Sequence, residues 1–196
     1  MSENIYKTLR AGGLSHVGAC ALMGNLEAES GLKSNNLQNS FEKSSVSDEV
    51  YTLAVDNGLY KNFAADQAGY GLAQWTHPDR KRKLLDFVAE LGASIGDENA
   101  QLKFALQELQ REYAGLYAYL CSDDAELYKA VSRICREYER PAVNNIGQRH
   151  AYAQKWDQYF SLNAVDIPKT EAKEPEPDKL DLIILKLDEI LQKLGA

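Results

Sequence analysis

The sequence predicts an all-α domain over residues 1–162, followed by a linker at residues 163–179 and a separate amphipathic helix at residues 180–196. Apolar residues recur at helical spacing in the first part, between polar capping residues and glycine or proline stops. The composition then shifts to prolines among charged residues. With 196 residues, 44% of them hydrophobic, the chain is large enough to bury a core.

Capping residues divide the first part of the domain into three expected helices, over residues 2–12, 15–29 and 47–57. A serine stands at or next to the start of each one, where its hydroxyl can accept a hydrogen bond from a free backbone N–H. A glycine follows the end of each one, as is typical of helix C-termini.

Residues 59–77 are expected to be irregular, because Gly69 and Gly71 favour a tight turn and allow a small hairpin. Pro78 fits the first turn of a helix that continues through Leu91. Further helices are expected from Asp97 onward, over residues 123–138 and over residues 145–160.

The last helix carries one apolar stripe with charged residues opposite. The stripe consists of Leu180, Ile183, Ile184, Leu187, Ile190, Leu191 and Leu194. It is wider than the seam of a two-stranded coiled coil, so three or four chains would bury it better. We therefore expect a homo-oligomer through residues 180–194. The alternative is that this helix folds back onto its own domain.

The charge and the cysteine content argue against several classes of protein. A net charge of −7 is unfavourable for nucleic-acid binding, and no apolar run is long enough to span a membrane. The first residues lack an apolar signal sequence, so we expect the protein to stay in the cytoplasm until it is released. Three cysteines and three histidines have no metal-ligand spacing, so the sequence predicts buried thiols, no metal site and no cofactor.

The run Gly24-Asn25-Leu26-Glu27-Ala28-Glu29-Ser30-Gly31-Leu32 places carboxylates at the end of the second helix. Glu27 and Glu29 are two positions apart, so on a helix they point in nearly opposite directions and cannot share one cleft. Glu29 lies at the helix exit, where the negative end of the helix dipole raises the pKa of a carboxyl group. A glutamate that stays protonated near neutral pH is suited to general acid catalysis.

The run Gly69-Tyr70-Gly71-Leu72-Ala73-Gln74-Trp75 has residue types suited to binding a sugar. Tyr70 and Trp75 have flat apolar faces, and the amide of Gln74 can hydrogen-bond a hydroxyl or acetamido group. His77 follows closely and could also contact a substrate. The alternative for Trp75 is a core position in a tight turn.

Together the two runs resemble the lysozyme superfamily, and more closely the phage tail lysozyme family. A basic stretch at residues 80–85, the run Tyr138-Glu139-Arg140-Pro141 and a later Arg149 and Ala153 are also similar to that family. The resemblance covers about residues 5–160. It implies a lysozyme-like fold, all-α or α+β with a hairpin near residues 59–77, without metal or cofactor.

The resemblance implies a glycosidase, of muramidase or glucosaminidase type, that cleaves the β-1,4 glycan bond of bacterial peptidoglycan. It implies that Glu29 is the general acid, that Tyr70 and Gln74 line the cleft, and that Tyr138 reaches it. With no signal sequence, we expect the protein to be held in the host cytoplasm before release, and the resemblance implies that it then acts on the cell wall.

The second catalytic group stays open at this point. Asp66, three residues before Gly69, is our first choice for a base that activates water. In a lytic transglycosylase no second carboxylate is needed, because the 6-hydroxyl of the sugar attacks and one glutamate acts as acid and then base. Two other classes remain: a non-catalytic phage structural or glycan-binding protein, and an amidase or peptidase with a Cys/His pair.

Overall fold

A computed structural model describes residues 2–42, 46–163 and 165 of the chain. Its elements are α1 (Ser2–Ala11), α2 (His16–Ser30), α3 (Asn39–Glu42), α4 (Asp48–Asp56), α5 (Pro78–Glu90), α6 (Glu98–Glu112), α7 (Ala114–Cys121), α8 (Leu127–Arg133), the π-helix η1 (Ile134–Glu139) and α9 (Ile146–Leu162). The all-α prediction is therefore confirmed. The predicted linker and oligomerising helix, residues 163–179 and 180–196, fall almost entirely outside the described residues.

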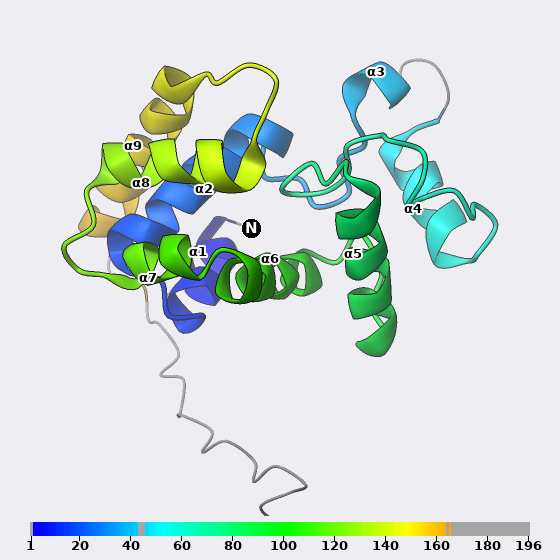
Figure 1. The fold of residues 1–196 in the computed structure, drawn as a ribbon, viewed down its shortest axis with the longest axis horizontal. Helices are drawn as coiled ribbons and strands as arrows, with labels where there is room; N and C mark the ends of the chain where they lie inside the picture. Colours follow the sequence, from blue (N-terminus) through cyan, green and yellow to red (C-terminus); the bar gives the residue numbers. More distant parts are fainter. Residues whose placement is uncertain (1, 43–45, 164, 166–196) are drawn as a thin grey trace, which may run out of the picture.

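Helix α2 is the centre of the fold, with α1, α7, α8 and α9 packed around it, while α3, α4 and α5 lie to the other side (Figure 1). Ser15 caps its first turn by accepting a hydrogen bond from the Gly18 N–H, and Gly31 ends it in the left-handed conformation. Both signals were in the sequence, so the predicted bounds of this helix are correct to within one residue. From Ala19 to Leu26 every side chain is buried, because other helices surround α2.

Two helical segments differ from the prediction. Residues 114–121 form a separate helix, α7, which begins directly after Tyr113 ends α6. The helix expected over residues 123–138 begins only at Leu127 and changes to π-helical geometry at Ile134. The left-handed Arg140 ends the π-helix. Neither change has a signal in the helical spacing of apolar residues.

Residues 59–77 contain no regular strand in the structure. Two isolated antiparallel bridges, Leu37 with Tyr70 and Tyr70 with Trp75, fold residues 69–75 into a tight loop. The loop is what remains of the expected hairpin. Within the described ranges, no helix is both long enough and apolar enough to cross a bilayer.

The most extensive helix packing is between α2 and α9, and it depends on Gly24. A Cβ atom at this position would lie 2.6 Å from both the Ala153 nitrogen and the Arg149 oxygen. These are backbone atoms of α9 and cannot rotate away. The glycine therefore sets the distance between the helices that carry Glu29 and Arg149.

We expect Gly24→Ala to lower the free energy of unfolding by about 1–3 kcal/mol, because α9 must shift to admit the methyl group. Urea unfolding followed by circular dichroism would measure it. Gly115→Ala in α7 is a matched control, since a Cβ there meets nothing within 4 Å. That control should gain about 0.5–1 kcal/mol from helix propensity. Equal effects of the two changes would contradict the role of Gly24.

Candidate active site

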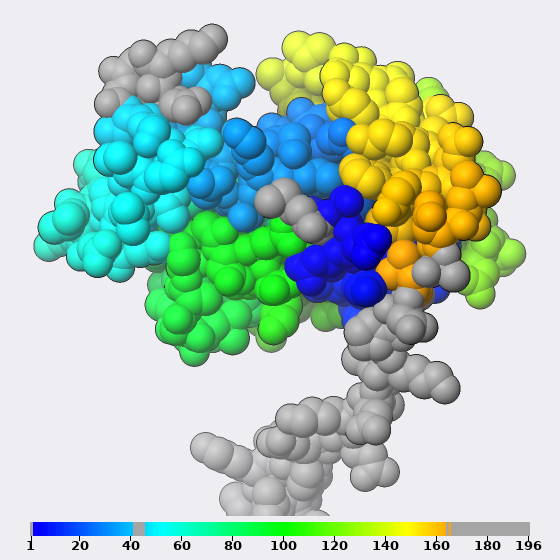
Figure 2. All heavy atoms as spheres, turned by 180° about the vertical axis from the view of Figure 1, so that it is seen from behind, coloured from blue at the N-terminus to red at the C-terminus, as the bar shows by residue number. Residues whose placement is uncertain are grey.

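A cleft with a volume of about 1050 Å³ lies at the end of α2. Its walls come from the end of α2, the loop at residues 67–77, the start of α5, the junction of α6 and α7, and residues 138–142. In the space-filling view the surface is hollowed between the segment near residue 40 and the yellow segment that precedes α9 (Figure 2). A cleft of this size, open on one side, can accept several sugar rings of a polymer.

Glu29 lies in the wall of this cleft, in the last turn of α2. Its Oε1 accepts a hydrogen bond of 2.5 Å from Nη2 of Arg149 on α9, and 17% of its side chain is exposed. Glu27 points elsewhere and accepts hydrogen bonds from Lys155 and Trp156 on α9. The helical geometry thus separates the two glutamates as expected, and only Glu29 is in the cleft.

Glu139 is a second carboxyl group in the same cleft, at the end of the π-helix η1. Its Oε1 is buried and has no hydrogen-bond partner among the described residues. Burial raises the pKa of Glu139 well above its usual value, and the charge of Glu29 raises this pKa further, against the opposing effect of Arg80 and Arg149. The two carboxyl groups therefore interact, and the surroundings of Glu139 favour its protonated form.

Ser30 joins the two sequence runs in space. Its hydroxyl donates a hydrogen bond of 2.9 Å to the Leu72 carbonyl, so the end of α2 is attached to the loop at residues 69–75. Gln101 of α6 supports the same loop by accepting a hydrogen bond from the Leu72 N–H. The serine that follows Glu29 is thus a positioning residue, which fixes the glutamate relative to the opposite wall.

Gln74 lines the cleft with a left-handed backbone, at φ 45°. Its Nε2 donates to the carbonyls of Asn36 and Gly71, at 3.0 and 3.1 Å. Both hydrogens of the amide nitrogen are therefore used within the protein. What the side chain can offer to a sugar is its Oε1, which accepts hydrogen bonds from hydroxyl or amide N–H groups.

Trp75 and Tyr138 meet in a buried network under the cleft. Glu108 of α6 accepts hydrogen bonds of 2.8 Å from Trp75 Nε1, from Tyr138 OH and from Arg80 on α5. Trp75 is fully buried, so its ring supports the loop and presents no face to solvent. Tyr138 is 1% exposed and borders the cleft only at its edge.

Asp66 and Tyr70 do not line the cleft. Asp66 forms an ion pair with the buried Lys81 at 2.5 Å and also accepts hydrogen bonds from Tyr51, Tyr60 and the Ala68 N–H. Tyr70 is fully buried, and its hydroxyl is 2.6 Å from that of Thr52. Both residues hold the loop region against α4 and α5, away from Glu29.

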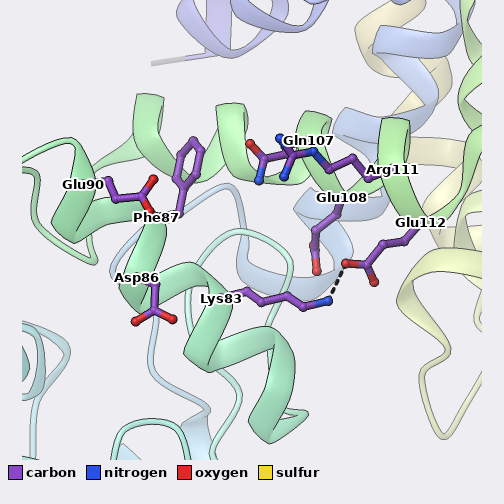
Figure 3. A pocket seen from close by; sticks show the side chains of 8 residues that line it. All are labelled: Lys83, Asp86, Phe87, Glu90, Gln107, Glu108, Arg111 and Glu112. Atoms are coloured by element: carbon purple, nitrogen blue, oxygen red, sulfur yellow. Dashed lines mark hydrogen bonds and ion pairs between the residues drawn. The ribbon is translucent and has the colours of Figure 1, made fainter. Parts of the chain in front are cut away.

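His77 caps α5 and stands at the rim of the cleft, with an exposed ring. A smaller hollow of about 370 Å³ adjoins the cleft between α5 and α6 (Figure 3). Lys83 and Glu112, which form an ion pair at 2.6 Å, border both spaces. The smaller hollow is lined mainly by charged surface residues, and the oxygens of Glu108 beneath it are already hydrogen-bonded. We assign the site to the larger cleft.

We expect Asp66→Asn to lower the free energy of unfolding by about 3 kcal/mol, because it leaves Lys81 buried without a counter-charge. Chemical unfolding measures this loss. The double variant Asp66→Asn/Lys81→Met should recover part of it, since both charges are then gone. A large fall in catalytic rate at unchanged stability would instead support Asp66 as the second catalytic group.

A helical domain with two carboxyl groups in a cleft at the end of its central helix fits the class of lysozyme-like, peptidoglycan-degrading domains. A family model described as phage tail lysozyme matches residues 1–160, and the chain belongs to this family. No curated protein matches the chain. The family match covers the helical domain except the last two residues of α9, and it includes both walls of the cleft.

Proposed function

We propose that this protein is a glycosidase that cleaves the β-1,4 bond between the amino sugars of peptidoglycan, with the glycan bound along the cleft between Glu29 and the loop at residues 69–77. The observation that supports this most is the convergence of Glu29 and Glu139 on one cleft. Acid-catalysed cleavage of a glycosidic bond needs a carboxylic acid at the leaving oxygen. A hydrolase requires a second carboxyl group nearby, and a transglycosylase tolerates one.

Glu29 is the proposed proton donor to the leaving oxygen. Its side chain reaches the cleft from the rigid end of α2, and Ser30 and Arg149 fix its position from two sides. Loops alone would hold it less well, because rigid elements keep a reacting group within the small tolerance that catalysis needs. The residue also stands in the Glu-Ser pair on which the family resemblance rests.

Glu139 is the proposed second carboxyl group, in place of Asp66. A specific observation also favours an exchange of roles: Glu139 has the raised pKa that suits a general acid, whereas Glu29 forms an ion pair with Arg149. In the exchanged assignment Glu139 gives the proton, and the Glu29 carboxylate stabilises the positive charge that develops on the sugar. The pH dependence of the rate distinguishes the two assignments.

Gln74 and His77 are proposed substrate contacts, through the Gln74 Oε1 and the exposed ring of His77. Trp75, Tyr70 and Tyr138 are proposed to act indirectly, by supporting the walls. The proposed partner is the glycan strand of the cell wall. Self-association through residues 180–194 stays a proposal, and it would raise apparent affinity for the wall by multivalency.

Mass spectrometry of peptidoglycan digested by the purified full chain tests the proposal. New reducing sugar ends would support a hydrolase, and the sugar that carries the new end would separate a muramidase from a glucosaminidase. Anhydro-sugar ends would support the transglycosylase alternative in the same cleft. Cuts in the peptide, or no new products at all, would overturn the proposal of a glycosidase.

A further inference from the structure

A second cluster of reactive side chains lies at the opposite end of α2 from Glu29. His16 is the first residue of α2, and Cys20 follows one turn later on the same face. Asp157 and Ser161 are likewise one turn apart on α9. Because α2 and α9 pack closely along their length, these two pairs meet between the helices.

The side-chain donor atoms of the cluster lie close to one another, around His16 Nε2. His16 Nε2 lies 2.9 Å from Asp157 Oδ1, 4.0 Å from Cys20 Sγ and 3.3 Å from Ser161 Oγ. The nitrogen, sulfur and carboxylate atoms of His16, Cys20 and Asp157 all lie within 4.8 Å of one another. The cysteine is fully buried, while the histidine and the aspartate are partly exposed, which leaves a path for an ion from solvent.

The orientation of the histidine ring also suits a metal ligand. Its other nitrogen, Nδ1, lies 2.8 Å from the hydroxyl of Tyr6 on α1. A metal on Nε2 requires the tautomer in which Nδ1–H donates to this hydroxyl and the Nε2 lone pair faces Cys20 and Asp157. Metal-binding histidines usually have such an outer hydrogen bond, which fixes the tautomer and the ring orientation.

We propose that His16, Cys20 and Asp157 bind a zinc ion that connects α2 to α9. A thiolate, a neutral imidazole and a carboxylate together carry two negative charges and neutralise a divalent cation. Zinc accepts this combination of sulfur, nitrogen and oxygen ligands, whereas magnesium and calcium require oxygen ligands. The fourth position would be filled by Ser161 Oγ or by water.

The observed distances need only a small adjustment for zinc. Bonds of about 2.0–2.3 Å in a tetrahedral site place the ligand atoms roughly 3.3–3.7 Å apart. The 2.9 and 4.0 Å separations lie on either side of this range, and all three ligand atoms lie within 4.8 Å of one another, so movements of about an ångström suffice. No metal-binding motif is visible in the sequence because the ligands come from two helices far apart in the chain.

The site would stabilise the fold without taking part in glycan cleavage. Glu29 is thirteen positions after His16 on the helix, roughly 20 Å away at the usual rise per residue. Zinc would nevertheless hold together the two helices that carry Glu29 and Arg149. A cysteine thiol is protonated at neutral pH and binds zinc as the thiolate, so binding releases the thiol proton to the buffer.

The test uses the untagged full chain, first treated with a chelator and a phosphine reductant. Titration calorimetry with zinc chloride should give one site per chain and release of one proton, seen as a dependence of the heat on the buffer. Zinc at a hundred times its dissociation constant should raise the melting temperature by roughly 5–10 °C. Cobalt(II) in place of zinc should give the near-ultraviolet charge-transfer band of a cobalt–thiolate bond.

His16→Gln and Asp157→Asn should each weaken zinc binding at least tenfold, and Cys20→Ser should also remove the cobalt–thiolate band. Cys135→Ser and His150→Gln are matched controls, since both residues lie outside the cluster, and they should bind as the wild type does. Absence of the cobalt–thiolate band from the wild-type protein would overturn the proposal without any variant. So would equal zinc binding by the wild type and the three cluster variants.

Discussion

Glu29→Gln is expected to lower the rate of peptidoglycan cleavage by roughly 100- to 10,000-fold, the usual contribution of a general acid or of a carboxylate that acts directly on the substrate. Glutamine keeps the size of the side chain and an oxygen that can accept a hydrogen bond from Arg149. It cannot donate a proton of suitable acidity or stabilise a developing positive charge. Release of new sugar ends from purified cell walls measures the rate.

The matched control is Glu27→Gln, in the same turn of α2. Glu27 interacts with Lys155 and Trp156 outside the cleft, so this variant should keep most of the activity. Glu29→Gln also leaves the buried Arg149 without its carboxylate, which costs stability. Unfolding curves and circular dichroism at the assay temperature separate this loss from the loss of chemistry. A folded Glu29→Gln variant with wild-type activity would contradict the assignment.

The features of the fold that were predictable from sequence have local causes. Ser15 and Gly31 mark the ends of α2 through hydrogen bonds and backbone conformations that lie within a few residues. The separation of Glu27 from Glu29 follows from helix geometry alone. The π-helix at residues 134–139, which packs against α2 and α8, has no such local signal.

The residues of the candidate site likewise divide into those with a local signal in the sequence and those that only tertiary packing brings to the cleft. Glu29 could be predicted because its helix end and its motif are local. Asp66 is a candidate from its proximity to Gly69 in the chain, but an ion pair with Lys81 turns its side chain into the core. Glu139 comes from a distant segment, and only tertiary packing brings it to Glu29. Its place beside Tyr138, in a run already similar to the family, was the one available signal.

The aromatic residues near the cleft are a further example of side chains whose role the sequence alone does not determine. A tryptophan beside a glycine-rich loop suits both sugar stacking and core packing, and only burial distinguishes the two. The hydrogen bond from Trp75 to Glu108 places the ring in the core. The same buried glutamate accepts from Tyr138 and Arg80, so one carboxylate connects the loop, α5, α6 and η1 beneath the cleft.

Glu139→Gln is expected to produce a protein that is more stable at neutral pH and slower by at least about 100-fold. Because the pKa of Glu139 is raised in the folded state, the folded protein binds a proton that the unfolded chain has released. The contribution of Glu139 to the free energy of unfolding is complete below the pKa that this group has in the unfolded chain. It is lost as the pH rises toward the pKa of Glu139 in the folded protein. The slope in that window is up to about 1.4 kcal/mol per pH unit.

A glutamine at this position stays neutral, so the variant should lose this pH dependence of the free energy of unfolding. Urea unfolding between pH 4 and pH 8 would show the difference.

The pH dependence of the wild-type rate then assigns the catalytic role of Glu139. If the rate falls as Glu139 loses its proton, Glu139 is the donor and Glu29 the stabilising carboxylate; if the rate rises, Glu139 is the base and Glu29 the donor. A variant with the altered stability curve and an unchanged rate would show that Glu139 has only a structural role, and the single-carboxylate mechanism through Glu29 would follow.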